Sequence, residues 1–222
     1  VRPEDLLQAV EDVIYHLKSF DALLVRSSLT NYFLSKIASD HVSTVLSGEG
    51  SDELFAGYDY LTQLDPSELQ GELLNLTTQL HNTALQRVDR CSSAHGLIAH
   101  TPYLDNAVVD LALQLPADYK LHRNGQLVAK WVLRQTAEDL LPDTIVNRPK
   151  EKFWQGAGVG QMIASHADEL ITDAEFQASR TLPGGSTINN KEEYLYFRVF
   201  TDHFGYFDDY SFVGRTKHPG TA

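Results

Sequence analysis

A short stretch in the first quarter of the chain brings small and acidic residues together directly after an apolar run. The apolar residues of 42–46 have the pattern of a buried strand, and Ser-Gly-Glu-Gly-Ser-Asp-Glu follows at 47–53. The two glycines permit a tight turn with exposed backbone N–H groups, and we expect Ser51 or Asp52 to cap a short acidic helix. A strand, a small-residue turn and a helix N-terminus form a common nucleotide-binding arrangement.

A second candidate segment is basic, in a chain that is otherwise acidic. Arg148, Lys150 and Lys152 alternate with other residues and lead into the glycine-rich run 156–160. Such a group of cations can offset the charge of phosphate groups. The same residues also fit an ordinary basic surface loop.

Composition narrows the class of protein. The 222 residues are 42% hydrophobic and 22% charged, which is typical of a globular protein, and the formal net charge of −12 argues against non-specific nucleic-acid binding. No apolar run approaches the roughly 18 residues that cross a bilayer, and no secretion signal opens the chain. The single cysteine, Cys91, excludes an internal disulfide framework and predicts a cytoplasmic protein. The first residue is Val, so we expect a trimmed, cleaved or partial chain.

Periodicity predicts many helices and only one or two strands, arranged as a helical body at the edge of an α/β sheet. The apolar residues of 20–25 read as a connection, Ser28 or Thr30 as the cap of a second helix, and 95–105 as a loop. Asp105 or Asn106 is expected to cap the helix after that loop. The further expected helices cover 3–17, 66–97, 126–141, 161–171 and 191–204, and we expect the last dozen residues to be frayed.

The string at 47–58 resembles the second signature of the synthetase domain in the asparagine synthase family. Further segments are similar to that family in the same order, namely 88–105, 148–153 and 191–198. The agreement of order and spacing extends from about residue 4 to about residue 205. Several independent segments in one order are stronger support than any single motif.

Two parts of a complete family member are not found in the sequence. The glutaminase domain with its N-terminal cysteine is missing, and so is the Ser-Gly-Gly-x-Asp-Ser pyrophosphate loop, since the nearest string, 183–186, lacks the aspartate. The resemblance therefore implies the C-terminal portion of an asparagine synthase domain over 1–205, with a C-terminal tail at 206–222. The implied fold class is α/β and predominantly helical, as the C-terminal part of an adenine-nucleotide alpha-hydrolase-like (PP-loop ATP pyrophosphatase) domain with a strand-turn-helix nucleotide site and a helical lobe.

The resemblance implies ATP-dependent conversion of aspartate to asparagine through a β-aspartyl-AMP intermediate, with ammonia from glutamine. By the same resemblance, Glu49 acts in adenylate formation and amidation, and Lys150 neutralises the departing pyrophosphate. Ser47 and Gly48 are expected to bind ATP, although they also fit a simple tight turn. Asp52 is expected to help hold Mg²⁺, although it also fits a helix N-cap.

Three residues depart from the common family pattern. Ile98 and His100 replace a carboxylate and a guanidinium of the loop before Pro-Phe-Leu-Asp, and Ala84 stands where an acidic residue often lies. Besides an incomplete or split ligase, the alternatives are a catalytically impaired partner or regulatory subunit and a β-lactam or carbapenam synthetase. Glu49 speaks against the last, since those enzymes carry tyrosine there.

The expected partners are the small-molecule substrates aspartate, ATP and ammonia, together with the missing N-terminal half of the enzyme in cis or in trans. We expect neither nucleic acid nor a membrane as a partner. Because the pyrophosphate loop is missing, the chain is predicted not to turn over alone.

Overall fold

The computed structural model of the protein describes residues 3–122, 127–149 and 159–216. The described chain divides into two units, which we treat separately. The first contains residues 3–45, 82–99 and 159–216, and the second contains residues 46–81, 100–122 and 127–149.

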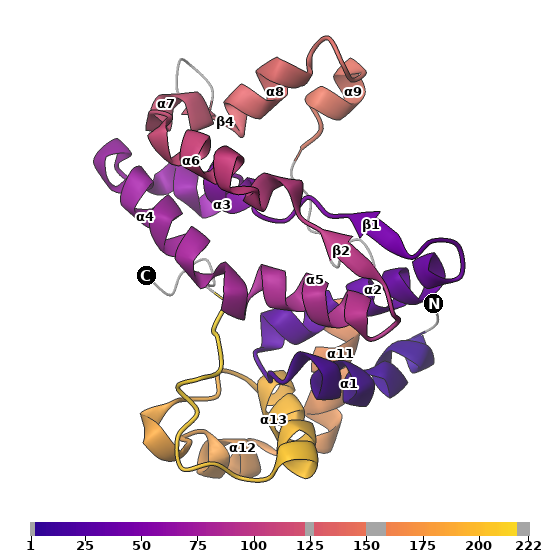
Figure 1. Cartoon of the computed structure of the whole chain (residues 1–222). Coiled ribbons are helices and arrows are strands. Elements are labelled where there is room, and N and C mark those ends of the chain that lie inside the picture. Colours follow the sequence, from indigo (N-terminus) through magenta and orange to yellow (C-terminus); the bar gives the residue numbers. More distant parts are fainter. Residues whose placement is uncertain (1–2, 123–126, 150–158, 217–222) are drawn as a thin grey trace. The chain divides into compact units, whose positions relative to one another are not determined.

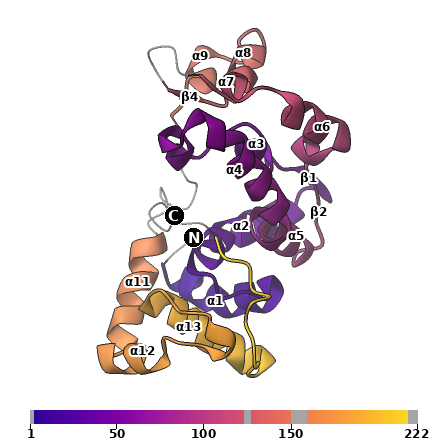
Figure 2. The ribbon, with the colours of Figure 1, turned by 90° about the vertical axis from the view of Figure 1, so that its left-hand side faces the viewer.

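The first unit is built from helices. Figures 1 and 2 show α1, α11 and α13 side by side, and α2 packs against both α1 and α5. The helices of this unit are α1 (Pro3–Leu17), α2 (Ala22–Ser39), α5 (Ala84–Ser93), α11 (Val159–Leu170), α12 (Asp173–Ser179) and α13 (Lys191–Phe204), with the short 3-10 helix η4 (Pro183–Gly185). The predicted helices 3–17 and 191–204 are confirmed.

The apolar stripe of α1 forms the centre of this unit, as its spacing predicts. Ile14 and Leu17 are fully buried, and so is Phe20 just after the helix. The Phe20 ring makes edge-to-face contacts with Phe197 and Phe200 of α13, at centroid distances of 5.2 and 5.4 Å. Burying side chains of this size contributes about 1.5–3 kcal/mol each, so α1 and α13 stabilise one another.

The start of α2 corrects the sequence prediction. The helix begins at Ala22, and Asp21 is its N-cap, accepting a hydrogen bond from the Leu24 amide at 2.9 Å. Ser28 lies inside the helix, where its hydroxyl donates to the Leu24 carbonyl at 2.7 Å. The apolar residues of 20–25 resemble a connection because this part of the helix is buried on several sides, which hides the helical period.

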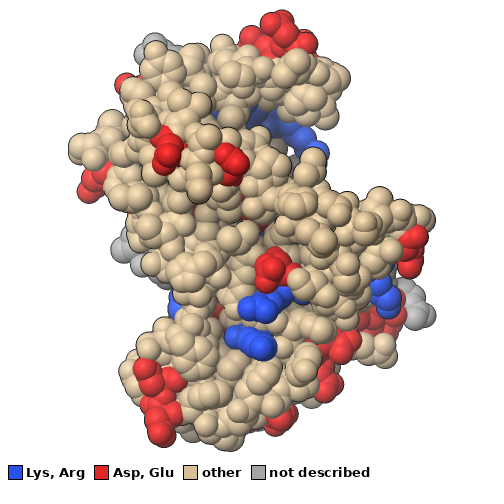
Figure 3. Space-filling view, viewed as in Figure 1, with Lys and Arg blue, Asp and Glu red and all other residues tan. Residues whose placement is uncertain are grey.

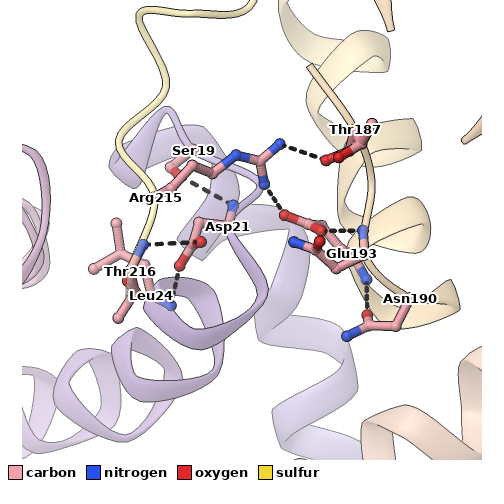
Figure 4. A network of polar contacts seen from close by, with 9 residues as sticks. Ser19, Asp21, Leu24, Thr187, Asn190, Glu193, Arg215 and Thr216 are labelled. Atoms are coloured by element: carbon pink, nitrogen blue, oxygen red, sulfur yellow. Dashed lines mark hydrogen bonds and ion pairs between the residues drawn. The ribbon is translucent and has the colours of Figure 1, made fainter. Parts of the chain in front are cut away.

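Residues after α13 return to the first unit and join its core, so the expected fraying is wrong for the described residues 211–216. Tyr210 and Val213 are buried. Arg215 pairs with the buried carboxylate of Glu193, and its guanidinium lies 4.9 Å from the centre of the Phe20 ring. Figure 4 shows the pair of Arg215 with Glu193 and the bond from the Thr216 amide to Asp21, at 3.2 Å.

The second unit contains short elements around two small apolar clusters. One cluster joins Ala56, Leu61, Leu69, Leu73 and Leu121, and the other joins Leu54, Phe55 and Ala112. Its helices are α3 (Ser51–Leu54), α4 (Pro66–Gln79), α6 (Asn106–Gln114), α7 (Ala117–Lys120), α8 (Trp131–Ala137) and α9 (Asp143–Val146), with the 3-10 helices η1 (Asp59–Gln63) and η3 (Pro102–Leu104). A further 3-10 helix, η2 (Leu80–Asn82), follows α4.

Two short sheets are present in the described chain. Strands β1 (Thr44–Leu46) and β2 (Ile98–His100) are parallel neighbours, joined by the Ile98 amide to the Ser43 carbonyl at 3.0 Å and the Ser47 amide to the His100 carbonyl at 2.8 Å. Strands β3 (Leu121–His122) and β4 (Val128–Ala129) pair antiparallel. The fold is mostly helical with a small parallel sheet, consistent with the predicted α/β class.

Three predicted boundaries are wrong. Residues 98–100 are a strand and not a loop, because pairing with β1 satisfies a stretch that has no helical period. The predicted helix 66–97 is broken between α4 and α5, where Thr83 leaves helical backbone geometry at φ −134° and ψ −110°. Within the described part of 126–141, the chain forms β4 and then α8, separated by Lys130 in a left-handed conformation.

A lysine is buried in the second unit. Lys120 has no exposed surface, and its Nζ donates to the Gln70 side-chain oxygen at 3.0 Å. Removal from water disfavours the charged form and lowers the pKa of Lys120 to about 8, from 10.5.

This burial predicts how stability depends on pH. Between pH 8 and pH 10.5 the unfolded chain holds the Lys120 proton more tightly than the folded one, so the free energy of unfolding should rise with pH. Urea unfolding from pH 8 to pH 9.5 is expected to show a gain on the order of 2 kcal/mol. Lys120→Met should remove this slope, whereas Lys36→Met, at an exposed lysine of α2, should keep it. An unchanged slope in Lys120→Met would exclude Lys120 as its source.

The acidic character of the chain is visible on its surface. On the face shown in Figure 3, the Asp and Glu side chains lie in several separate groups.

No described helix combines the length and the apolar character needed to cross a membrane.

Candidate functional site

The predicted nucleotide turn follows β1 and is held by one bond to β2 and by one side-chain bond within the turn. The Ser47 amide donates to His100 in β2, and the Gly48 carbonyl accepts the hydroxyl of Ser51 at 2.8 Å. Gly50 has a φ of +91°, and a Cβ there would lie 2.4 Å from the Leu104 side chain. This position therefore requires glycine for both its conformation and its space.

Helix α3 after the turn is shorter than expected and is capped differently. Its N-cap is Gly50, which makes no side-chain capping bond, and Ser51 and Asp52 are the first two helical residues. The prediction that Ser51 or Asp52 is the N-cap is wrong, because the cap has a left-handed conformation, which glycine adopts without the steric cost of a Cβ. A helix of one turn adds little dipole, so anion binding here would depend on the turn itself.

Asp52 makes an ion pair with a residue that the sequence analysis did not single out. Its carboxylate lies 2.8 Å from the Lys130 Nζ, and each side chain is about a quarter exposed. The same Nζ donates to the Ser51 hydroxyl at 2.9 Å. Lys130 is 79 residues from Ser51 along the chain, so no local spacing could have indicated it.

A buried acid lies behind the turn. Glu53 is 3% exposed, and its carboxylate accepts the hydroxyl of Tyr58 at 2.5 Å. Burial raises the pKa of Glu53, and the neighbouring charges of Asp52 and Glu49 raise it further. The sequence predicts a short acidic helix here, but no local pattern indicates the pair of Glu53 with Tyr58. The structure shows a carboxyl group removed from water.

Glu49 lies between the two glycines and is partly exposed. Its charge is close enough to raise the pKa values of Glu53 and Tyr58. The charges of Glu49, Asp52 and Glu53 therefore all act on Tyr58, and Asp52 also pairs with Lys130. Of the predicted site residues, Ser47, Gly48, Glu49 and Asp52 share this turn, and Lys150 lies outside the described residues.

The remaining candidates have structural roles or stay exposed. Asp105 caps α6, accepting from the Ala107 amide at 2.9 Å, as predicted. Ile98 and His100 are exposed in β2, and Ala84 is buried at the start of α5. The ring of His95 packs against that of Tyr32, with the two ring centroids 4.4 Å apart.

Mg²⁺ can be compared with the donors that the structure offers. Within the described ranges, no group of three or more His, Cys, Asp or Glu residues could enclose a metal ion. Asp52 supplies a partly exposed carboxylate, and Mg²⁺ commonly takes one or two protein carboxylates together with phosphate oxygens of the substrate. Asp52 therefore fits as one ligand of an ion shared with a nucleotide.

Comparison with known proteins identifies the family. The model of the asparagine synthase family matches residues 1–71 and 61–209. The chain belongs to this family. Membership agrees with the resemblance found in the signature turn and in the segments that follow it.

Members of the asparagine synthase family from distant organisms are similar over most of the chain. Asparagine synthetase [glutamine-hydrolyzing] 2 of Lotus japonicus is 35% identical over 210 residues, which are 90% of this chain and 36% of the relative. Asparagine synthetase B of Escherichia coli is 34% identical over 202 residues, which are 89% of this chain and 36% of the relative. The asparagine synthetase of Gallus gallus is 35% identical over 211 residues, which are 90% of this chain and 37% of the relative. The chain thus spans little more than a third of the length of these relatives.

Proposed function

We propose that this chain is the C-terminal portion of an ATP-dependent, amide-forming ligase that converts aspartate to asparagine. The observation that carries the proposal is the signature turn at the end of a strand, where Lys130 pairs with Asp52 and where the charges of Asp52 and Glu49 are close enough to raise the pKa of Glu53. In a protein of this family, such a turn supports a site for a nucleotide and an amino acid. The proposed domain covers 1–205 and has the PP-loop ATP pyrophosphatase fold once complete, with 206–222 as a tail whose Tyr210 and Val213 pack into the core.

The proposed reaction has two steps. A carboxylate oxygen of aspartate attacks the α-phosphorus of ATP, the bond to pyrophosphate breaks, and β-aspartyl-AMP forms. Ammonia derived from glutamine then attacks the acyl carbon, AMP leaves, and the nitrogen loses one proton. Glu49 is the proposed group that acts on the acyl centre and accepts this proton, since a partly exposed carboxylate can serve as a base.

The other proposed roles concern phosphate. Backbone groups of Ser47 and Gly48 contact ATP, and Gly48 leaves open space, because a Cβ at this position would meet nothing within 4 Å. Lys150 offsets the negative charge that develops on the pyrophosphate. Asp52 would hold Mg²⁺, which would neutralise charge on the phosphate oxygens.

The two parallel strands support a partner in the form of the remaining, N-terminal half of the enzyme, in cis or in trans. Parallel sheets are almost always covered on both faces. Here the outward apolar side chains remain exposed, with Leu46 of β1 at 77% and Ile98 of β2 at 59%. Further strands and helices of the same domain would cover them.

The test is pyrophosphate release with ATP, Mg²⁺, aspartate and ammonia. The 222-residue chain alone is expected to give none, and addition of the N-terminal part of the Escherichia coli relative, from its start to the equivalent of residue 1, is expected to restore it. Release by the chain alone would contradict the split-enzyme proposal. Absence of release in both mixtures, with the mixture shown to form a complex, would favour a catalytically impaired partner.

A further inference from the structure

Lys130 has an unusual backbone for a residue with a side chain. It precedes α8 in a left-handed conformation, with φ 55° and ψ 36°. Such a conformation costs a non-glycine residue free energy, and it persists where surrounding contacts over-determine it. The contacts are present: the Lys130 amide donates to the Phe55 carbonyl at 3.1 Å, and its side chain reaches Ser51 and Asp52.

The glycine at position 57 leaves room for this pair. A Cβ on Gly57 would lie 1.8 Å from the Asp52 carboxylate and 2.4 Å from the Lys130 Cε. The Gly57 amide donates to the Asp52 carbonyl at 2.8 Å, so its backbone cannot move away without losing that bond. A larger residue at 57 would therefore require the Asp52 and Lys130 side chains to shift.

Arg134 holds the segment from which Lys130 projects. Its Nε donates to the Ala129 carbonyl at 2.9 Å, just before Lys130, and its two terminal nitrogens donate to the carbonyls of Val146 and Arg148. One side chain of α8 thus contacts the strand end, the end of α9 and the start of the basic segment. These bonds fix the backbone next to Lys130, whose side chain contacts α3.

We propose that Lys130 is a positioning residue of the candidate site. Its ammonium holds the Ser51 hydroxyl and the Asp52 carboxylate toward one point and so fixes the turn that carries Glu49. The expected effect of Lys130 on the reaction rate rests on the proposed function. Its expected effect on the order of the turn does not depend on that function. If Lys130 acted only through fold stability, its replacement would loosen the whole second unit and not the turn alone.

The test compares two lysines with the same backbone strain. Lys130→Gly relieves the left-handed conformation and removes the ammonium, and Lys18→Gly relieves the same φ of 55° at an exposed residue after α1. In the 222-residue chain, hydrogen exchange at 48–55 is expected to rise at least about ten-fold in Lys130→Gly, with α4 unchanged. Lys18→Gly is expected to leave exchange at 48–55 unchanged.

A kinetic measurement on the complemented enzyme gives the second readout. Lys130→Gly is expected to lower kcat for pyrophosphate release by about 100-fold, to leave KM for ATP within about three-fold, and to regain rate when propylamine is added. Lys130→Asn, in which asparagine tolerates the left-handed conformation, is expected to behave alike and serves if the glycine variant fails to fold.

The outcomes separate the two proposals. Normal exchange at 48–55 in Lys130→Gly and Lys130→Asn would overturn the positioning role, as would a loss of rate that propylamine cannot restore. If the complemented parent releases no pyrophosphate, the proposed function fails, and the exchange experiment alone still decides whether Lys130 orders the turn.

Discussion

Glu49→Gln in the complemented enzyme is expected to reduce amide formation by about 10²- to 10⁴-fold, the usual contribution of a positioned acid or base. The amide keeps the size of the side chain but cannot accept the proton released by ammonia. Because Glu49 is partly exposed in a turn, the variant should fold with a free energy of unfolding within about 0.5 kcal/mol of the parent. Steady-state asparagine formation and urea unfolding measure the two quantities.

The matched control is Glu68→Gln, at an exposed acid in the first turn of α4. It removes the same charge from the same unit without touching the turn, so its rate should equal that of the parent. A Glu49→Gln variant that retains full rate would show that the proposed role of Glu49 is wrong, and the resemblance would then extend to the fold alone.

Lys150→Ala is the second large effect, with an expected loss of about 10²- to 10³-fold in kcat for pyrophosphate release. The cation offsets charge that appears on the leaving group as the bond to the α-phosphorus breaks, so its removal affects the transition state more than the bound substrate. KM for ATP should therefore change less than kcat. Pyrophosphate release under saturating aspartate measures both constants.

Two variants distinguish this role from general basic charge. Lys152→Ala removes a neighbouring positive charge of the same segment and should cost less than about ten-fold, because it lies outside the proposed contact. Lys150→Arg keeps the charge with a different shape and should recover part of the rate. Equal losses in Lys150→Ala and Lys152→Ala would indicate an unspecific electrostatic effect of the basic segment.

Sequence patterns predicted the elements whose burial is one-sided. Helices α1 and α13 have apolar residues at helical spacing and polar residues between them, and both bounds agree with the structure. Asp105 was predicted as a cap because a short acidic side chain before an apolar helix accepts a hydrogen bond from a backbone amide of the first turn. The acidic turn was also predicted from residues that are consecutive in the chain.

Sequence patterns did not predict the elements whose burial or pairing comes from distant residues. The start of α2 is covered by other helices, so its apolar residues did not show a period. Strand β2 is defined by its bonds to β1, and the end of the described chain is fixed by Glu193 and Asp21. None of these contacts leaves a signal within a window of neighbouring residues.

The amino-acid sequence by itself determined the family of this protein, the signature turn at 47–53 and the identity of the acids that it carries, since all of these depend on consecutive residues. Only the tertiary structure decided what surrounds the turn: the Lys130 ion pair on Asp52, the Tyr58 bond to the buried Glu53, and Leu104 packed over Gly50. The physical reason is that a pKa or an ion pair depends on distance and on exclusion of water, and folding brings together residues far apart in the chain.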